Sequence, residues 1–146
     1  MGIDADAIVL GCVKRKAAGR HPARDLYTST LWRRRRRYAD ASGLRWFIFS
    51  AEHGLIDPGL MVAWYDGRLD DLARAVRAAK GEEAAVTLEG LLGGLGGKTI
   101  EVHAGATYVS AIRPPMEARG GRVLTPLAGL SIGRQYQWYD RVFEEQ

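Results

Sequence analysis

The sequence has few of the residues that characterise disulfide-rich, zinc-binding and membrane-spanning proteins. Its 146 residues contain one cysteine and three histidines. These numbers exclude an internal disulfide framework and a cysteine-rich zinc site. No apolar run approaches the length of a membrane span. Asp4 and Asp6 interrupt the N-terminal segment, so we expect no signal peptide and a cytoplasmic protein without membrane contact.

Positive charge exceeds negative charge, which favours an anionic partner. Lysine and arginine number 21 against 17 aspartates and glutamates, for a net charge of +4. A nucleotide, a nucleoside or nucleic acid would suit this balance. Much of the excess lies in one run, Arg33 to Arg37, and a solvated helix face would explain that run equally well.

Apolar strand patterns alternate with helical patterns along the chain. The expected strands cover about 7–11, 46–49, 99–103 and 122–126, and 61–66 is extended. The expected helices cover about 30–41, 69–79 and 82–92, then a short one that stops near Pro114, and a last one from Ile132 to Phe143. Gly81 is expected to separate the second and third helices. This order predicts a single α/β domain over residues 1–146. We expect a Rossmann-like fold of three layers, with a mainly parallel sheet of about four strands and helices on both faces.

Chemically active side chains follow the expected strands. Right-handed crossovers place the carboxyl ends of parallel strands at one edge, where ligands bind in open α/β sheets. Grouped by strand end, the residues are Cys12, Lys14 and Lys16; Ser50, Glu52, His53 and Gly54; His103, Gly105 and Tyr108; and Gly129. We expect them to share a substrate-binding pocket, although loops are polar in most proteins.

The loop after the first strand combines a thiol with cations. Lys14 and Lys16 could bind phosphate as point charges, or could form a solvated basic loop. Cys12 could act as a thiolate nucleophile beside these lysines. A lone cysteine at a strand end is more often a packing residue, and we favour that interpretation. The lysines therefore matter more than the thiol.

Three residues are candidates for acid–base catalysis. Glu52 and His53 follow the second strand, and either could transfer a proton. His53 could instead only hydrogen-bond its loop, and His103 could be a satisfied core histidine. Tyr65 and Asp66 could flank a base or a sugar, or could form a surface turn.

The arginine run divides by helical geometry. Arg33, Arg36 and Arg37 point away from the apolar face, whereas Arg35 lies within it. A guanidinium there must find a partner, reach a pocket or extend to the helix edge. We select Arg34 and Arg35 as candidate nucleic-acid contacts.

Two further expectations concern cofactors and assembly. The sequence contains no His-x-x-x-His pattern and no clustered carboxylates, so we predict neither a metal nor a cofactor. The four tryptophans exceed what one small core needs, which favours a homodimer.

Six short motifs, in this order, resemble a known family. They are Gly11-Cys12-x-Lys14-x-Lys16, Arg24-Asp25-Leu26-Tyr27, Ser50-Ala51-x-His53-Gly54-Leu55, Tyr65-Asp66, His103-Ala104-Gly105-x-x-Tyr108 and Pro126-Leu127-x-Gly129-Leu130-x-Ile132-Gly133. The family is DUF6884, small bacterial and phage domains of unknown function. It is distantly similar to the YaaA peroxide-stress proteins, which implies DNA binding. A weaker similarity to uracil-DNA-glycosylase-like folds implies cleavage of an N-glycosidic bond, with His103 in a comparable place.

Three hypotheses for function follow. The first is an enzyme that acts on a nucleotide, a nucleoside or a nucleic-acid base at the N-glycosidic bond, with phosphate held by the lysines. The second is a non-catalytic nucleic-acid-binding protein that contacts phosphates through the arginine run. The third is a nucleotide sensor that uses the same pocket without turnover.

Overall fold

The structure of the protein is a computed structural model that describes residues 2–13 and 16–144. Its main sheet has the strand order β4-β3-β1-β6-β7. The strands are β1 (Ala7–Gly11), β3 (Arg45–Ser50), β4 (Gly54–Ile56), β6 (Thr99–His103) and β7 (Arg122–Leu124). Strand β4 is antiparallel to β3, and the other neighbours are parallel. The predicted α/β class with a mainly parallel sheet is therefore confirmed, and the four parallel strands end at one edge.

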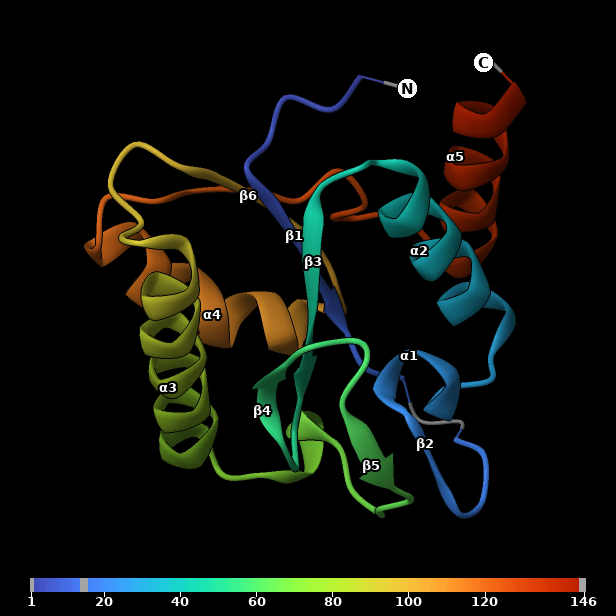
Figure 1. Ribbon diagram of the computed structural model, residues 1–146, viewed down its shortest axis with the longest axis horizontal. Coiled ribbons are helices and arrows are strands. Elements are labelled where there is room, and N and C mark those ends of the chain that lie inside the picture. The colour runs from blue at the N-terminus through green and yellow to red at the C-terminus, as the bar shows by residue number, and fades with distance from the viewer. Residues whose placement is uncertain (1, 14–15, 145–146) are drawn as a thin grey trace.

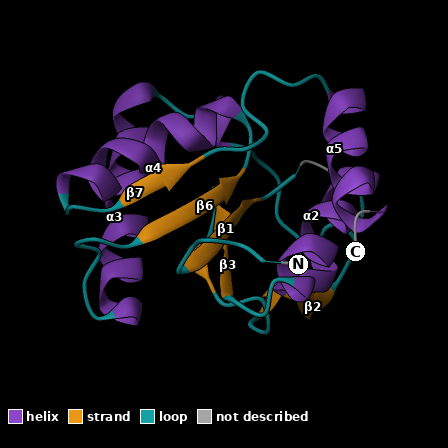
Figure 2. Ribbon diagram, turned by 90° about the horizontal axis from the view of Figure 1, so that it is seen from above, coloured by secondary structure: helices purple, strands orange, loops and turns teal. Residues whose placement is uncertain are grey.

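Helices lie on both sides of this sheet. Helices α2 (Thr30–Ala41) and α5 (Ile132–Glu144) lie on one side, and α3 (Arg74–Leu92) and α4 (Ala106–Ala118) lie on the other (Figures 1 and 2). A small second sheet pairs β2 (Arg20–Pro22) with β5 (Met61–Ala63), next to α1 (Ala23–Leu26). A short 3₁₀ turn, η1 (Leu69–Asp71), precedes α3. None of the described helices is long and apolar enough to cross a membrane.

Strand β1 is the centre of the core. Its residues from Ala7 to Leu10 have no exposed surface, as expected for a strand with neighbours on both edges and helices on both faces. The strand ends at Gly11, where a Cβ atom would lie 2.5 Å from the Cβ of Ala104. The chain after β6 therefore passes directly over the end of β1, and this contact brings two of the strand ends together.

Two of the predicted helix stops lie inside helices. Helix α3 is continuous through Gly81, so the predicted pair of helices over 69–79 and 82–92 is wrong. Helix α4 likewise continues through Pro114 and Pro115 to Ala118. The reason is tertiary packing. Pro115 has no N–H to donate to the carbonyl of Ala111, and that carbonyl instead faces Gly81.

Most of the tryptophans are at least partly buried in the fold. Trp32 and Trp46 are buried and Trp138 is half-buried, whereas Trp64 is 53% exposed. A second copy of the chain is thus not needed to cover most of them. The homodimer remains a prediction.

Substitution of Gly81 should show how closely α3 and α4 pack. A Cβ atom at this position would lie 1.9 Å from the carbonyl oxygen of Ala111, so Gly81→Ala should lower the free energy of unfolding by about 1–3 kcal/mol. Gly90 lies in the same helix, and a Cβ added there would have no atom within 4 Å. Gly90→Ala should therefore raise the free energy of unfolding by about 0.5–1 kcal/mol. Urea unfolding of both variants measures the difference. Equal stability of the two would contradict the close contact.

Candidate functional site

A pocket lies at the carboxyl edge of the sheet, and we call it the strand-end pocket. Its volume is about 330 Å³, near the lower end for small-ligand sites. It is lined by Cys12, Val13, Leu31, Arg35, Arg68, Asp70, Gly105, Ala106, Thr107, Tyr108, Ile132 and Gln135. The lining thus comes from the end of β1, from α2, from the segment around η1, and from the starts of α4 and α5. Of the residues predicted from the sequence, it brings together Cys12, Arg35, Gly105 and Tyr108.

The first turn of α4 forms one wall of the pocket. Gly105 precedes the helix and offers no side chain to its free N–H groups, and the first turn holds no acidic residue. The first hydrogen bond within the helix runs from the Val109 N–H to the Gly105 carbonyl at 3.1 Å. The preceding N–H groups therefore have no acceptor in the helix, and they carry its partial positive charge. Such a wall favours an anion.

Arg35 supplies a fixed positive charge beside that wall. Its side chain is buried, with 4% of its surface exposed, and Nη1 donates a hydrogen bond to the carbonyl of Gly11 at 3.0 Å. Its buried Nε has no hydrogen-bond partner among the described residues. Burial lowers the pKa of this guanidinium. An unmatched donor on a buried cation is unfavourable, and it favours a polar ligand as the missing partner.

A chain of buried hydrogen bonds extends from Arg35 into the interior. The guanidinium of Arg35 interacts with Tyr139, whose hydroxyl lies 2.6 Å from Nδ1 of His103. The other ring nitrogen, Nε2, lies 2.7 Å from a carboxylate oxygen of Glu101, and Tyr38 donates to the same oxygen at 2.5 Å. Glu101 and His103 face the same side of the sheet because they are two residues apart on β6. His103 is thus completely buried behind Arg35 and does not line the pocket.

The network has a defined protonation state. Burial lowers the pKa of His103. Burial alone would raise the pKa of Glu101, but hydrogen bonds from His103 and Tyr38 outweigh it and hold that pKa below its ordinary value. The ring is therefore neutral and the carboxylate is charged. A neutral ring donates from Nε2 to Glu101 and accepts at Nδ1 from Tyr139, so every member of the chain has a partner.

Cys12 lies next to a cluster of tyrosines. Its Sγ is 3.1 Å from the hydroxyl of Tyr108. The hydroxyls of Tyr27 and Tyr65 lie 2.8 Å apart, and Ser50 donates to that of Tyr65 at 3.0 Å. Burial, reinforced by an electrostatic effect of Cys12, raises the pKa of all three tyrosines above the ordinary value. These hydroxyls are therefore neutral polar groups around the thiol.

Of the two predicted phosphate-binding lysines, one can be placed. Lys14 lies outside the described residues. Lys16 is half-buried, with its Nζ 4.3 Å from the centre of the Tyr65 ring. Burial lowers its pKa, while electrostatic interactions with Cys12 and Asp66 oppose that effect. Lys16 thus lies beside the tyrosine cluster but is not part of the pocket lining.

Glu52 and His53 lie on the exposed turn between β3 and β4. Their backbone N–H groups donate to the hydroxyl of Ser50 at 3.2 and 3.1 Å, which explains why that serine is buried at the strand end. The ring of His53 packs edge-on against Tyr65 with their centres 5.1 Å apart. Glu52 lines a small neighbouring cavity of about 140 Å³ together with Tyr65 and Asp66. Neither Glu52 nor His53 lines the strand-end pocket, and their catalytic roles remain predictions.

The predicted glycines differ in their positions. Gly54 is buried in the β3–β4 turn with a φ of 71°, and Gly129 is exposed in the loop before α5 with a φ of 78°. Neither belongs to the pocket lining. Arg68 and Asp70 do line the pocket, but they could not be selected from the sequence because they follow no strand of the main sheet.

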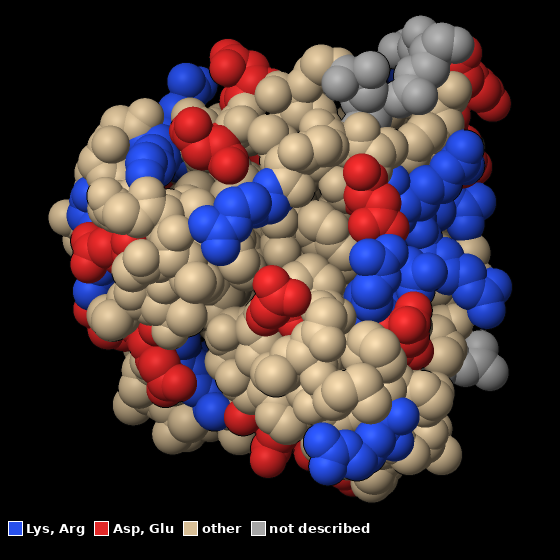
Figure 3. Space-filling view, in the orientation of Figure 1, with Lys and Arg blue, Asp and Glu red and all other residues tan. Residues whose placement is uncertain are grey.

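The arginine run is divided as its periodicity predicts. Arg33 and Arg37 are exposed, and basic side chains gather on the side of the molecule where α2 and α5 lie (Figure 3). Arg36 forms an ion pair with Asp25 at 2.6 Å. Arg34 instead joins α2 to α5, because it pairs with Asp140 at 3.1 Å and stacks on Tyr136 at 4.4 Å.

No metal centre accompanies the pocket in the part of the chain that the structure describes. There, no three histidine, cysteine, aspartate or glutamate residues are grouped closely enough to hold an ion. The polar groups of the pocket therefore suit an organic or phosphate ligand better than a metal ion.

Comparisons with known proteins give one kind of match. A family model described as a family of unknown function, DUF6884, matches residues 7–141. That range includes every residue of the strand-end pocket. Comparisons with curated proteins and with solved structures gave no match.

The buried network should make stability depend on pH. The folded chain keeps His103 neutral, whereas the unfolded chain takes up a proton as pH falls below the ordinary value of 6.5, so stability is complete above that value and is lost below it. The loss should approach about 1.4 kcal/mol per pH unit. Glu101 adds a loss at lower pH, below 4.5, as its lowered pKa is reached. Urea unfolding between pH 7.5 and 5 should show a slope that His103→Gln flattens.

The exposed histidine offers a matched control for that measurement. His53→Gln makes the same substitution at an exposed position outside the buried network, and its unfolding is measured over the same pH range. A wild-type slope that survives in His103→Gln would show that the buried network is not its source.

Proposed function

The chain belongs to DUF6884, a family of unknown function, and we propose that it is an enzyme acting on a nucleotide, a nucleoside or a nucleic-acid base. The observation that carries this proposal is Arg35, a buried cation with an unmatched Nε beside the first turn of α4. These are two separate sources of positive potential, and both are held by the packed core. Together they suit the phosphate of the ligand. We also propose a Rossmann-like fold of three layers, in which ligands bind at this edge of the sheet.

A nucleotide suits the pocket better than a free phosphate ion. The volume of about 330 Å³ leaves room beyond a phosphate group. Val13, Leu31 and Ile132 supply apolar walls on which a sugar or a base can pack. The polar groups lie at the sheet edge and at the start of α4, so we place the phosphate there and the base toward the apolar side.

The pocket also holds a carboxylate that can accept a proton. Asp70 lines it and forms an ion pair with Arg68 at 2.5 Å. We propose hydrolysis of the N-glycosidic bond. Water adds to C1′ as the bond to the base nitrogen breaks, and the proton that water loses to Asp70 ends on the departing base. Under this proposal, Asp70 takes the acid–base role that the sequence predicted for Glu52, His53 or His103.

A second function is favoured by the surface of α2. Arg33 and Arg37 are exposed, and neither forms an ion pair with any described residue. With the other basic side chains in Figure 3, they would suit the phosphates of nucleic acid. Under this alternative the chain is a non-catalytic, YaaA-like nucleic-acid-binding protein. Arg33→Met with Arg37→Met would then abolish retention of DNA, while the binding of a small nucleotide would be unaffected.

Ligand binding tests the role of Arg35. Nucleoside 5′-monophosphates should raise the melting temperature more than the same nucleosides do. Arg35→Met should remove this preference and weaken nucleotide binding by about ten- to a hundredfold, the effect of one lost charge-assisted contact. Titration calorimetry gives the constants. Arg122→Met removes one exposed cation from the opposite edge of the sheet and should bind like the wild type. Equal binding of nucleosides and nucleotides would refute the phosphate site.

Release of free base tests the role of Asp70. Asp70→Asn keeps the size of the side chain but cannot accept a proton, so base release should fall about a hundredfold or more while nucleotide binding is largely kept. Chromatography of nucleotides and single-stranded DNA after incubation measures the free base. If the wild type releases no base from any of these substrates, the proposed hydrolysis is wrong.

A further inference from the structure

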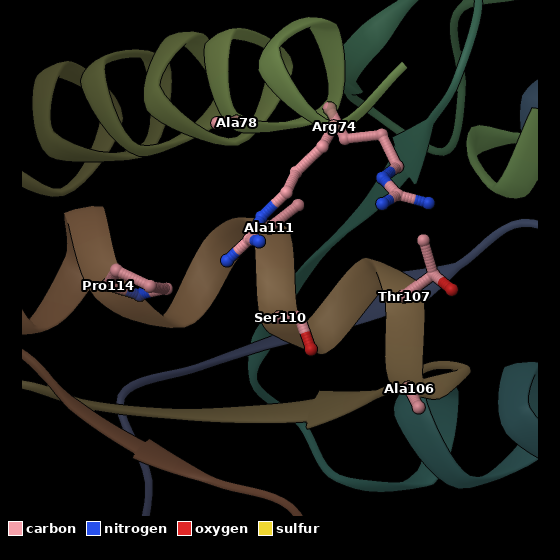
Figure 4. Close-up of a pocket in the computed structure, with 8 residues that line it drawn as sticks. Arg74, Ala78, Ala106, Thr107, Ser110, Ala111 and Pro114 are labelled. Atoms are coloured by element: carbon pink, nitrogen blue, oxygen red, sulfur yellow. The ribbon is translucent and has the colours of Figure 1, made fainter. Parts of the chain in front are cut away.

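A second cavity lies between α3 and α4, and we call it the α3–α4 groove. Its volume is about 400 Å³, and it is lined by Arg74, Arg77, Ala78, Ala106, Thr107, Ser110, Ala111 and Pro114. Arginine side chains reach from α3 toward α4, which presents the hydroxyls of Thr107 and Ser110 (Figure 4). No aromatic side chain lines this groove, so it suits a phosphate and a sugar better than a base.

The groove shares a wall with the strand-end pocket. Ala106 and Thr107 line both cavities, so the first turn of α4 is a wall that the two share. Thr107 and Ser110 are three residues apart, which places them on one face of the helix at about 5–6 Å between Cβ atoms. A ligand that crosses this turn would therefore pass from Arg35 to a second set of polar groups.

The arginines of the groove lack carboxylate partners. Neither Arg74 nor Arg77 forms a side-chain hydrogen bond or an ion pair with any described residue, and no described residue of the lining is acidic. Many other arginines do have such partners: Arg24, Arg34, Arg36, Arg68, Arg113 and Arg119. The first turn of α3 contains no acidic residue either. The lining of the groove thus contains two cations and no carboxylate.

We propose that the α3–α4 groove binds a second phosphate of the ligand whose first phosphate occupies the strand-end pocket. The ligand is then a single-stranded nucleic acid of at least two nucleotides. This inference rests on the proposed function, because the first phosphate is the one assigned to Arg35. Neighbouring phosphates of a nucleoside di- or triphosphate share one bridging oxygen and therefore lie closer together than successive phosphates of a nucleic acid. Successive phosphates of a nucleic acid are separated by a whole sugar, which matches two cavities with a common wall.

Binding of three probes tests the groove. They are a nucleoside 5′-monophosphate, the corresponding triphosphate and a 5′-phosphorylated single-stranded tetranucleotide. Arg74→Met combined with Arg77→Met should weaken tetranucleotide binding about tenfold. A plot of the logarithm of the binding constant against the logarithm of the salt concentration should become shallower by about 0.7, the slope of one lost phosphate contact. Binding of the monophosphate and the triphosphate should stay within twofold of the wild type. Arg122→Met combined with Arg45→Met removes the same charge from the starts of β7 and β3, at the opposite edge of the sheet, and should bind all three probes normally.

Each result either supports or overturns the inference. Wild-type affinity of the groove variant for the tetranucleotide would overturn it, and so would an equal loss for the monophosphate. A loss for the triphosphate as large as that for the tetranucleotide would assign the groove to a pyrophosphate and overturn the nucleic-acid ligand. Failure of the proposed function is recognised separately, because Arg35→Met would then leave monophosphate binding unchanged or the wild type would bind no probe.

Discussion

The burial of one guanidinium, that of Arg35, determines how the rest of the structure is arranged around the site. A charged group can leave water only where fixed polar groups replace its hydration. Here the Gly11 carbonyl and the Tyr139 hydroxyl do so, and Tyr139 in turn requires His103. The end of β1, two helices and β6 therefore have to assemble together before this cation is accommodated. The same assembly fixes the position of the charge relative to the first turn of α4.

This arrangement assigns ligand binding and proton transfer to different parts of the carboxyl edge of the sheet. The polar chain behind Arg35 is fully buried and rigid, so it can hold a charge at a constant position. The residues that could exchange protons with a ligand, such as Asp70, come from the segment between β5 and α3 and are exposed. Binding groups thus belong to the core, whereas candidate reactive groups belong to a connecting segment, as is common when a scaffold positions a site.

Much of the fold was accessible from the sequence because the apolar runs are unambiguous. Residues 7–11 form a buried strand as predicted, and Ser29 caps α2 by accepting a hydrogen bond from the Trp32 N–H at 3.1 Å. The continuity of α3 could not be predicted from the sequence. Glycine ordinarily weakens a helix. Only the close approach of Ala111 on α4 explains why Gly81 lies inside α3. Local signals therefore described the elements well and failed where a contact between two helices decided the outcome.

Only part of the site could be predicted from the sequence, and the reasons are similar. The helical period placed Arg35 on the apolar face of α2, and its burial follows from that. His103 was recognised as a strand-end residue, but alternation along β6 turns it and Glu101 toward α2 and α5, where Tyr38 and Tyr139 meet them. Asp70 and Arg68 belong to no periodic pattern. Their place in the pocket depends on how the chain crosses the sheet edge, which no short stretch of sequence encodes.

The contact between Gly81 and the Ala111 carbonyl has a consequence for how the α3–α4 groove can move. It joins two backbones without an intervening side chain, so no change of rotamer can widen or narrow the spacing of the helices at that point. Sliding of α3 along α4 would bring the residues next to Gly81, which carry a Cβ, against the carbonyl. The distance between the two helices is therefore fixed at this point. Adaptation to ligands of different shape then falls to the long, flexible arginine side chains, while the backbone stays in place.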